Sequence, residues 1–476
     1  KPGELCSDEV FLRRVYLDLT GLLPTPDRAI YFLENEDPDK RAKLIDELLA
    51  TDEHSSFWTQ KWGDLLKLST RQMGASGVLK FHRWIHQNVA DNRPYDEFAR
   101  DILLASGSNL TNPASNFYRT GSDTSDVTES TAQLFLGTRI GCAKCHNHPY
   151  ERWTQDNYYG LSAFFNRIET KKTGRKDEVV VWINSEGDVR HPATNEIMEP
   201  WAPKGEDLEV GEKEDRRVAF ANWLTSPENP YFAQVEVNRI WAHLLGRGIV
   251  EPFDDFRDTN PPSNAPLLEA LTKEFVESGF DRRKLIRQIV SSNTYQASSE
   301  PHEANRFFSH YVPRRITAEQ LIDALGDLTG VPERFHAVPA SMKATQLPAP
   351  DLKPHDRAKL GDIEFLKVFG QPERQTVCEC ERGDDASLGQ ALELYNGGTV
   401  HKMLSNPENR IYRALREEQS AEHIIFELYL RAFGRKPSAT EQQVVLSYVN
   451  SSEDRGDAFE DVVWALINKD EFLYQH

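Results

Sequence analysis

The 476-residue chain has few cysteines and methionines, five of the former and four of the latter. It also lacks any run approaching the roughly eighteen apolar residues that a bilayer-crossing helix needs. Its first residues, KPGELCSDEVF, do not have the charged-then-apolar pattern of a signal peptide, so we expect a processed form without a transmembrane segment.

Positive charge is also in short supply. The 56 lysines and arginines are outnumbered by 75 aspartates and glutamates, which gives a formal net charge of −19. Nucleic acids are bound through clustered lysine and arginine, so this balance argues against a nucleic-acid partner. An acidic surface instead favours basic protein partners or bound cations. With 39% hydrophobic residues, the chain is expected to fold into two or three globular domains.

The common hydrolase and nucleotide-binding motifs are missing. We find no Gly-x-Ser-x-Gly, no phosphate-binding glycine-rich loop and no His-Glu-x-x-His. A glycosidase-type carboxylate pair remains conceivable, because sequence cannot show whether two carboxylates lie about 5 to 10 Å apart.

Helix signals cover most of the chain. SDEVFLRRVYLDLTG has apolar residues at helical spacing between Ser7, a candidate N-cap, and Gly21, where we expect the helix to end. LPTPDRAIYFL begins again with Thr25 as cap and Pro26 at the first helical position. Capping-box spacing also occurs at two later helix starts, Thr317 with Gln320 and Ser438 with Glu441. The sequence therefore predicts a mainly α protein.

One segment departs from this pattern. EVVVWINSEGDVR predicts a β-hairpin, with a β-branched run, a turn from Asn184 to Gly187 and a short return strand. It lies in a stretch rich in charge, glycine and proline, which we interpret as a connecting insert. We expect a helical N-terminal domain over 1–170, the insert over 171–213 and a larger helical domain over 214–476.

The segment GCAKCHNHPYERW contains the strongest functional motif. Cys142, Cys145 and His146 have the Cys-x-x-Cys-His spacing of covalent c-type haem attachment. The two thiols would bond the vinyl groups of one haem, and His146 would be the proximal iron ligand. We expect His148, two residues further on, to be a locally hydrogen-bonded histidine.

Three other interpretations use the same residues. Zinc could bind Cys142, Cys145 and His148, but a structural site usually has a fourth ligand from a second close pair. An iron–sulfur cluster would need Cys378 and Cys380, whose spacing differs from ferredoxin runs. A thioredoxin-like pair would need a βαβ context that is not seen here. We favour haem.

The identity of the ligand on the distal side of the iron would distinguish an electron carrier from a haem enzyme. A methionine or histidine there gives a low-spin carrier, whereas an open position admits peroxide. Met198, Met342 and His243 are candidates, and His82 with His86 forms an i, i+4 pair. The sequence does not choose among them.

A second cation site is conceivable in EPFDDFRDTNPPSN. Asp254, Asp255 and Asp258 are ligands of the kind that Ca²⁺ prefers, although the EF-hand spacing is missing. The alternative is a solvated acidic loop with helix-capping roles.

Longer stretches resemble a known domain pair. DEVFLRRVYLDLTGLLPTPD, PYDEFARDILLASGS and TAQLFLGTRIGCAKCHNHPYERWTQDNYYGLSAFF resemble the planctomycete-type cytochrome c domain of unknown function, the PSCyt type. DRRVAFANWLTSPENPYFAQVEVNRIWAHLLGRGIVEPFDDFRDTNPPSNAPLLEAL, RRITAEQLIDAL, CECERGDDASLGQALELYNG and ELYLRAFGRKPSATE are similar to its usual companion, the PSD type. Together these stretches span nearly the whole chain.

The resemblance implies a secreted or periplasmic haem protein, often from bacteria rich in polysaccharide-degrading genes, but no known reaction. Relatives often carry an additional N-terminal cytochrome domain; none is seen here, so we expect one haem c per chain. Because c-type haem is matured outside the cytoplasm, the compartment would permit disulfides. Cys6 could then pair with Cys378 or Cys380.

These observations lead to one expected function and two alternatives. We expect an extracytoplasmic monohaem cytochrome c that exchanges single electrons with a protein partner, and the acidic charge favours a basic one. The size of the second domain counts against a simple carrier, since about a hundred residues enclose one haem. A haem enzyme, peroxidase-like or linked to carbohydrate processing, and a structural cell-surface module are the alternatives.

Overall fold

The computed structural model describes residues 3–121, 123–149, 151–204, 208, 210–211, 214–300, 307–335, 338–352, 361–377, 381–383 and 386–476. The described chain is mainly α, as predicted, with only small antiparallel sheets. It divides into two compact units, which we describe separately. The first unit contains Lys1–Gln60, Val290–Pro372 and Arg382–His476, and the second contains Lys61–Ile289 and Glu373–Glu381.

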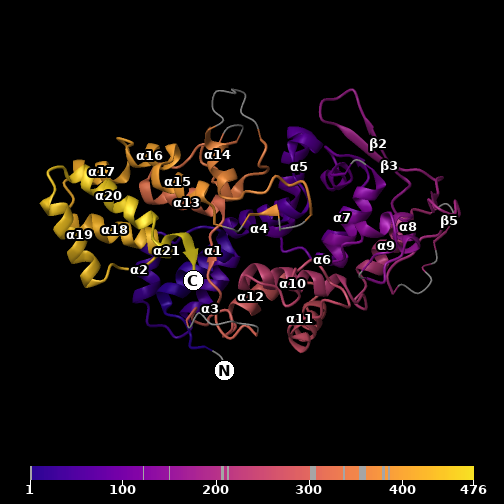
Figure 1. The fold of residues 1–476 in the computed structure, drawn as a ribbon, viewed down its shortest axis with the longest axis horizontal. Helices are drawn as coiled ribbons and strands as arrows, with labels where there is room; N and C mark the ends of the chain where they lie inside the picture. Colours follow the sequence, from indigo (N-terminus) through magenta and orange to yellow (C-terminus); the bar gives the residue numbers. More distant parts are fainter. Residues whose placement is uncertain are drawn as a thin grey trace. The chain divides into compact units, whose positions relative to one another are not determined.

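The first unit is built from both ends of the chain, and the N-terminal helices lie beside the C-terminal ones (Figure 1). The N-terminal elements are α1 (Asp8–Thr20), α2 (Pro26–Glu34), α3 (Lys40–Leu49) and the larger part of α4 (Asp52–Leu65). The later elements are β6 (Arg314–Arg315), α13 (Ala318–Thr329), η3 (Ala344–Gln346), α14 (Gly361–Val368), α15 (Leu388–Asn396), α16 (Gly398–Leu404), α17 (Arg410–Arg416), α18 (Ala421–Phe433), α19 (Ala439–Ser451), α20 (Arg455–Ile467), α21 (Asp470–Leu473) and β7 (Tyr474–Gln475).

The predicted helix ends of this unit are confirmed. The Ser7 side chain accepts a hydrogen bond from the Val10 amide at 3.3 Å, and α1 ends at Gly21 with φ 71°, a left-handed conformation that glycine adopts without strain. Thr317 and Ser438 both form complete capping boxes. These local rules therefore locate the helices of the first unit.

The hydrophobic core of the first unit lies between α13, α16, α18 and α20. Leu321, Ile425 and Phe459 are buried there, and Leu17 of α1 joins the same cluster. Burying each such side chain contributes about 1.5–3 kcal/mol. The N-terminal helix is thus part of a core made mostly by the last third of the chain.

Two buried arginines of α1 bind the end of the chain. The Arg13 guanidinium donates to the Ala432 carbonyl at 2.6 Å and to the Phe472 carbonyl at 2.7 Å. Arg14 is fully buried and donates through Nε to the His476 carbonyl at 3.2 Å. Burial lowers the pKa of Arg13 to about 10, so backbone carbonyls have to solvate this charge in place of water.

Asp18, one turn further along α1, supplies the negative charge. Its carboxylate is 1% exposed and accepts hydrogen bonds from the Tyr295 hydroxyl at 2.7 Å and the Gln475 amide at 2.6 Å. It also forms an ion pair with Arg314. Burial raises the pKa of Asp18, and Arg314, Tyr295, Gln475 and Arg14 offset part of that desolvation.

Replacing Asp18 by alanine is expected to destabilise the protein strongly. The substitution removes the carboxylate that faces Arg314, whose side chain is 23% exposed, and the fully buried Arg14, and breaking such a largely buried ion pair costs about 3–5 kcal/mol. The free energy of unfolding in urea measures the change. Glu9→Ala, at an exposed position of the same helix, should alter it by less than about 0.5 kcal/mol. Equal effects of the two substitutions would show that the Asp18 network is not structurally important.

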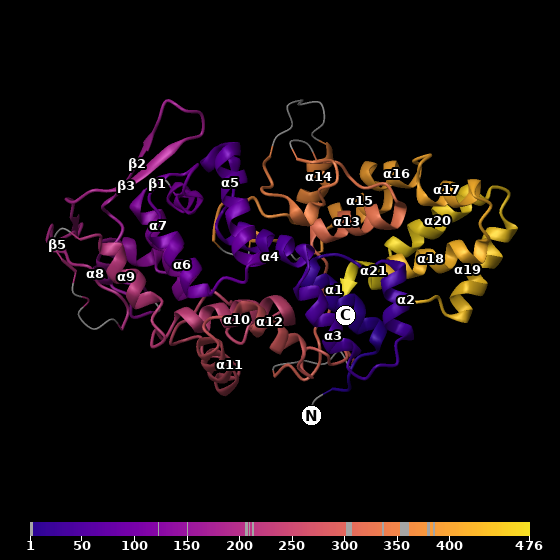
Figure 2. The same ribbon diagram turned by 180° about the vertical axis from the view of Figure 1, so that it is seen from behind.

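The second unit consists of helices around an aromatic core, with the β1–β3–β2 sheet beside α5 and α7 (Figure 2). Its helices are α5 (Thr70–Ala90), α6 (Tyr95–Leu103), η1 (Pro113–Arg119), α7 (Thr124–Leu136), η2 (Gly141–Lys144), α8 (Gln155–Ser162), α9 (Arg216–Leu224), α10 (Phe232–Leu245), α11 (Ala265–Glu277) and nearly all of α12 (Arg282–Val290). Its strands are β1 (Gly107–Ser108), β2 (Ile168–Lys172), β3 (Val179–Ile183), β4 (Val189–Arg190) and β5 (Ile197–Met198).

Stacked rings form the centre of this unit. The Tyr95 and Phe232 rings are nearly parallel with centroids 4.4 Å apart, and Trp62 meets Phe98 edge-on at 4.9 Å. Arg282 lies over Phe98 at 4.8 Å, and burial lowers its pKa. Aromatic packing of this kind contributes about 0.5–1.5 kcal/mol per pair beyond the area buried.

The predicted hairpin is wrong in its pairing. The β-branched run does form a strand, β3, but it pairs with the preceding β2, with Lys172 opposite Val179. The residues after the Asn184–Gly187 turn form β4, which pairs with β5 instead. The reason is that β2 (Ile168–Lys172) is mostly exposed and polar, so it has no hydrophobic alternation to mark it as a strand.

Candidate functional site

The Cys-x-x-Cys-His motif lies on the short η2 turn between α7 and α8. The amides of Cys145 and His146 approach the Cys142 carbonyl at 3.4 and 3.5 Å. The chain here makes one helical turn, in which positions i, i+3 and i+4 are neighbours on one face. Cys142, Cys145 and His146 are all exposed. The structure thus gathers the three predicted residues on one accessible turn.

The orientation of the His146 ring is fixed by the backbone. Its Nδ1 lies 2.8 Å from the Asn147 carbonyl, which can only accept a hydrogen bond, so Nδ1 carries a proton. In the neutral ring the lone pair is then on Nε2. This is the arrangement by which proteins usually prepare a histidine for binding a metal through Nε2.

Helix α8 supports the turn from one side. The Tyr159 hydroxyl donates to the Lys144 carbonyl at 3.0 Å, and the Gln155 side chain donates to the same oxygen at 3.2 Å. The Gln155 amide also donates to the Asn147 side chain at 3.0 Å. A capping box between Thr154 and Asn157 begins this helix. The motif is therefore anchored through its backbone, while its reactive side chains stay accessible.

Tyr159 is close enough to the motif to interact with it electrostatically. Burial raises the pKa of its hydroxyl, Lys144 lowers it, and Cys145 raises it further. The Tyr159 ring also meets the His191 ring edge-on, with centroids 5.9 Å apart. Tyr159 thus forms one wall beside Cys145.

Glu129 of α7 lies on another side of the turn. It accepts a hydrogen bond from the Tyr158 hydroxyl at 2.8 Å, and burial raises the pKa of Tyr158. A Cβ added to Gly141 would lie 3.2 Å from a Glu129 carboxylate oxygen, so the glycine allows this close approach. We did not predict Glu129 from the sequence, because it is one of 75 acidic residues and has no motif of its own.

A buried lysine partly balances this negative charge. The Lys67 ammonium donates to the Ser130 hydroxyl at 2.9 Å, next to Glu129 in the chain. Burial lowers the pKa of Lys67, and Asp126 and Glu129 act in the opposite direction. Lys67 and Glu129 therefore place opposite charges near one another in low-dielectric surroundings, where charges interact strongly.

The candidate distal ligands lie on different elements. Met198 is half-buried in β5, which packs against α8, the helix that also contacts η2. His243 is in the last turn of α10, in the same unit. Met342 belongs to the first unit and packs against its hydrophobic core. None of the three is brought into a described contact with His146, so the distal ligand stays a prediction.

The remaining histidines named in the sequence analysis are His148, His82 and His86. The His148 amide donates to the Trp153 carbonyl at 2.7 Å, which closes the loop after the motif. His82 and His86 lie on α5. Burial, together with Arg374 and His86, lowers the pKa of His82 to about 3.

The three aspartates of the proposed calcium loop have basic or amide partners. Asp254 is buried and accepts from Gln133 at 2.5 Å and Arg139 at 2.6 Å. Asp255 pairs with Arg257 at 3.1 Å, and the exposed Asp258 lies 3.7 Å from Arg152. Over the described residues, no group of three or more His, Cys, Asp or Glu side chains is arranged to hold a metal ion. The calcium site stays a prediction.

The predicted disulfide involves residues outside the described part of the chain. Cys6 is buried in the first unit and is a free thiol there. Cys378 and Cys380 lie outside the described residues. Cys142 and Cys145 are free thiols as well.

A pocket of about 240 Å³ lies in the second unit, next to the loop that follows the motif. Its walls combine charged and aromatic side chains, with Arg152 donating to the Tyr231 hydroxyl at 2.9 Å. Trp153, Lys204, Gln234 and Glu269 also line it.

In the described part of the chain, no helix has the length and apolar character needed to span a membrane.

Two family models of unknown function match successive parts of the chain. Residues 1–170 match the PSCyt2 model and residues 216–449 match the PSD1 model, both described as proteins of unknown function, DUF1549 and DUF1553. The two matches follow one another in the order of the planctomycete-type pair that the sequence resembles. No curated protein and no solved structure matched the chain.

The buried His82 predicts a pH dependence of stability. Its pKa is about 3 in the folded chain and near 6.5 when unfolded, so between these values the unfolded state binds the extra proton. Stability from this group is complete above about pH 6.5 and falls as the pH is lowered towards 3, by at most ~1.4 kcal/mol per pH unit.

Urea unfolding at a series of pH values tests this. His82→Gln should flatten the decline below pH 6.5, whereas His401→Gln, at an exposed position, should leave it unchanged. An unaltered pH profile in His82→Gln would contradict the assignment.

Proposed function

We propose that Cys142, Cys145 and His146 hold one covalently attached haem c, and that the protein is an extracytoplasmic monohaem cytochrome. The observation that carries the proposal is the η2 turn, with two accessible thiols and an imidazole whose Nδ1 is engaged by the Asn147 carbonyl. Thioether formation needs accessible thiols at this spacing, and iron needs a free Nε2.

The residues of the turn fit this group better than they fit zinc. A tetrahedral zinc site needs its ligands to converge on one point, and no such convergence exists among the described side chains. Covalent haem attachment uses the same residues differently, since the thiols bond the edge of the ring and only the histidine binds the iron.

When bound, the haem would supply one-electron redox chemistry. The chain's own residues would hold it: Cys142 and Cys145 would fix its position through thioether bonds, and His146 would offer its imidazole to the iron. Glu129 places negative charge near the motif, and negative charge favours the ferric state, while the Lys67 ammonium opposes this effect. The balance of these two groups would set part of the redox potential.

Covalent attachment can be tested by mass and spectrum. After production with a cytochrome-maturation system, the denatured wild-type chain should keep the mass of one haem. Cys142→Ser combined with Cys145→Ser should remove it. His146→Ala should keep the haem mass but change the absorption spectrum, because only the axial ligand is lost.

His148→Ala is the matched control, since it lies two residues from His146 and is not expected to bind the iron. It should retain both the mass and the wild-type spectrum. A wild-type chain that stays colourless under these conditions, or that contains zinc, would refute the proposal.

We further propose that the haem exchanges single electrons with a basic protein partner. The net charge of −19 supports this, because long-range attraction accelerates encounter with an oppositely charged protein. Electron exchange with a basic redox protein, measured by stopped flow, should slow as ionic strength rises from about 0.01 to 0.15 M, where screening shortens from about 30 to 8 Å. A rate independent of salt would remove the charge-steering part of the proposal.

A haem enzyme is the second candidate, and the pocket beside Arg152 and Trp153 favours it. This pocket of about 240 Å³ follows the motif directly in sequence and has convergent polar groups, as small-molecule sites do. Low-spin iron that ignores cyanide and peroxide would support the carrier. High-spin iron with rapid peroxide consumption would support the enzyme.

A further inference from the structure

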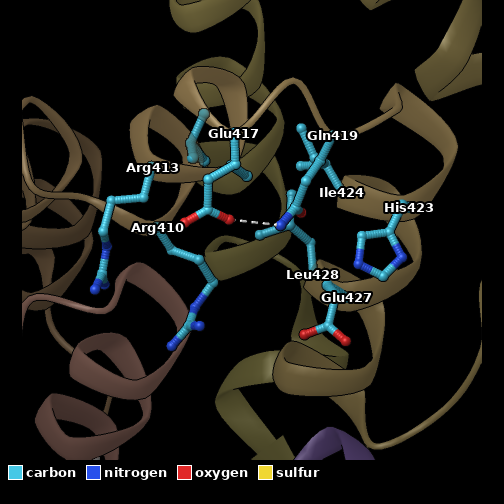
Figure 3. A pocket seen from close by; sticks show the side chains of 10 residues that line it. Arg410, Arg413, Glu417, Gln419, His423, Ile424, Glu427 and Leu428 are labelled. Atoms are coloured by element: carbon cyan, nitrogen blue, oxygen red, sulfur yellow. Dashed lines mark hydrogen bonds between the residues drawn. The ribbon is translucent and has the colours of Figure 1, made fainter.

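A second pocket, in the first unit, is lined by two arginines of one helix together with two glutamates and a histidine. It lies between α17 and α18 and has a volume of about 190 Å³. Figure 3 shows Arg410 and Arg413 extending from α17 in the same direction, with His423 and Glu427 of α18 on the other side of the pocket. Arg431 lies on the same helix as Glu427, one turn further on.

The carboxylates of this pocket already have partners. Glu417 accepts a hydrogen bond from the Gln419 amide at 2.9 Å (Figure 3). Glu427 accepts from Arg431 at 3.1 Å. Glu427 is thus shared with Arg431, and among the described residues neither carboxylate of the pocket lies within ion-pair distance of Arg410 or Arg413.

Arg410 and Arg413 themselves make only long hydrogen bonds. Arg410 donates to the Asp327 carbonyl at 3.3 Å, and Arg413 donates to the Gly330 carbonyl at 3.4 Å, both at the C-terminal end of α13. Among the described residues, neither arginine has a carboxylate within ion-pair distance, and Arg410 Nε is buried without a hydrogen-bond partner. Each guanidinium has five N–H donors, so most of them lack a protein acceptor among the described residues, and those of the exposed Arg413 are open to solvent.

Their proximity to other cations is unfavourable in the free protein. The pKa of Arg410 is lowered to about 10 by burial and then by Arg431 and Arg413, while Glu427 and Asp327 act in the opposite direction. Contact with the C-terminus of α13 offsets part of this, since a helix end carries partial negative charge. That contact needs one donor per carbonyl and leaves the rest of each guanidinium available.

We propose that Arg410 and Arg413 bind a small phosphate-type oxyanion, either free phosphate or the terminal group of a phosphomonoester. Two planar guanidinium groups three residues apart on one helix can each bond two oxygens of a tetrahedral anion. A dianion would balance both charges, and the pocket volume suits a small ligand. Gly330 contributes space, because a Cβ there would lie 2.5 Å from Arg413 Nη2.

Binding of inorganic phosphate to the full chain tests this site. Isothermal titration at pH 7.5, with ionic strength held constant by sodium chloride, should show saturable binding to the wild type. Arg413→Gln should weaken it about 10- to 100-fold, which corresponds to the loss of charge-assisted hydrogen bonds. Arg413→Lys should give an intermediate affinity, because lysine keeps the positive charge but lacks the paired N–H donors with which a guanidinium binds two oxygens at once.

Arg416→Gln is the matched control on the same helix. Arg416 donates to the Pro407 carbonyl at 2.8 Å and pairs with Glu408, so its loss should leave phosphate affinity unchanged. Thermal unfolding without phosphate checks that each variant is folded. Equal phosphate affinity in Arg413→Gln and Arg416→Gln, or no binding to wild type at ~10 mM, would overturn the proposal.

Two further ligands define the chemistry. Glycerol phosphate should bind as tightly as inorganic phosphate if the site accepts a phosphomonoester, and markedly less if it holds only the free ion. Acetate, a monoanion, should bind more weakly than either. Acetate binding equal to that of phosphate would contradict a site for a dianion.

Discussion

The buried charges of α1 are the constraint on which the first unit depends. Arg13, Arg14 and Asp18 are each no more than 2% exposed, and an uncompensated charge at such depth costs several kcal/mol. Their partners are backbone carbonyls and side chains from the last fifty residues and from the region around Tyr295. The burial of the N-terminal helix in the folded chain therefore depends on these distant segments packing around it.

In the second unit, the candidate site is the η2 turn, which is held by residues of the neighbouring helix α8. The proposed haem attachment would need exposed thiols and a fixed backbone at the η2 turn, and the structure meets these two requirements with different residues. Tyr159 and Gln155 bind main-chain oxygens and leave the side chains of Cys142 and Cys145 accessible. Glu129 and Lys67 add opposite charges near the turn, and burial strengthens the electrostatic interactions of such charges. The residues that hold the turn and set the charge around it thus lie outside the motif itself.

How far the sequence predicts these features depends on the range of the interactions involved. Helix starts at Ser7, Thr317 and Ser438 were predicted correctly because a cap and its partner lie within four residues. The common turn of Cys142, Cys145 and His146 was predictable for the same reason. The approach of Glu129 to Gly141 depends on how α7 packs, which no local pattern encodes. The strand β2 was missed because its exposed, polar residues resemble a loop.

The division of the chain into two units bears on how such a protein could have evolved. The PSCyt2 match, 1–170, supplies α1 to α3 to the first unit and α5 to α8 to the second. The PSD1 match, 216–449, likewise contributes α13 and α18 to the first unit and α10 to the second. A recombination event between the two matched segments would split both folded cores at once. The pair is therefore expected to be inherited together, as a single unit of selection, even though it is recognised as two families.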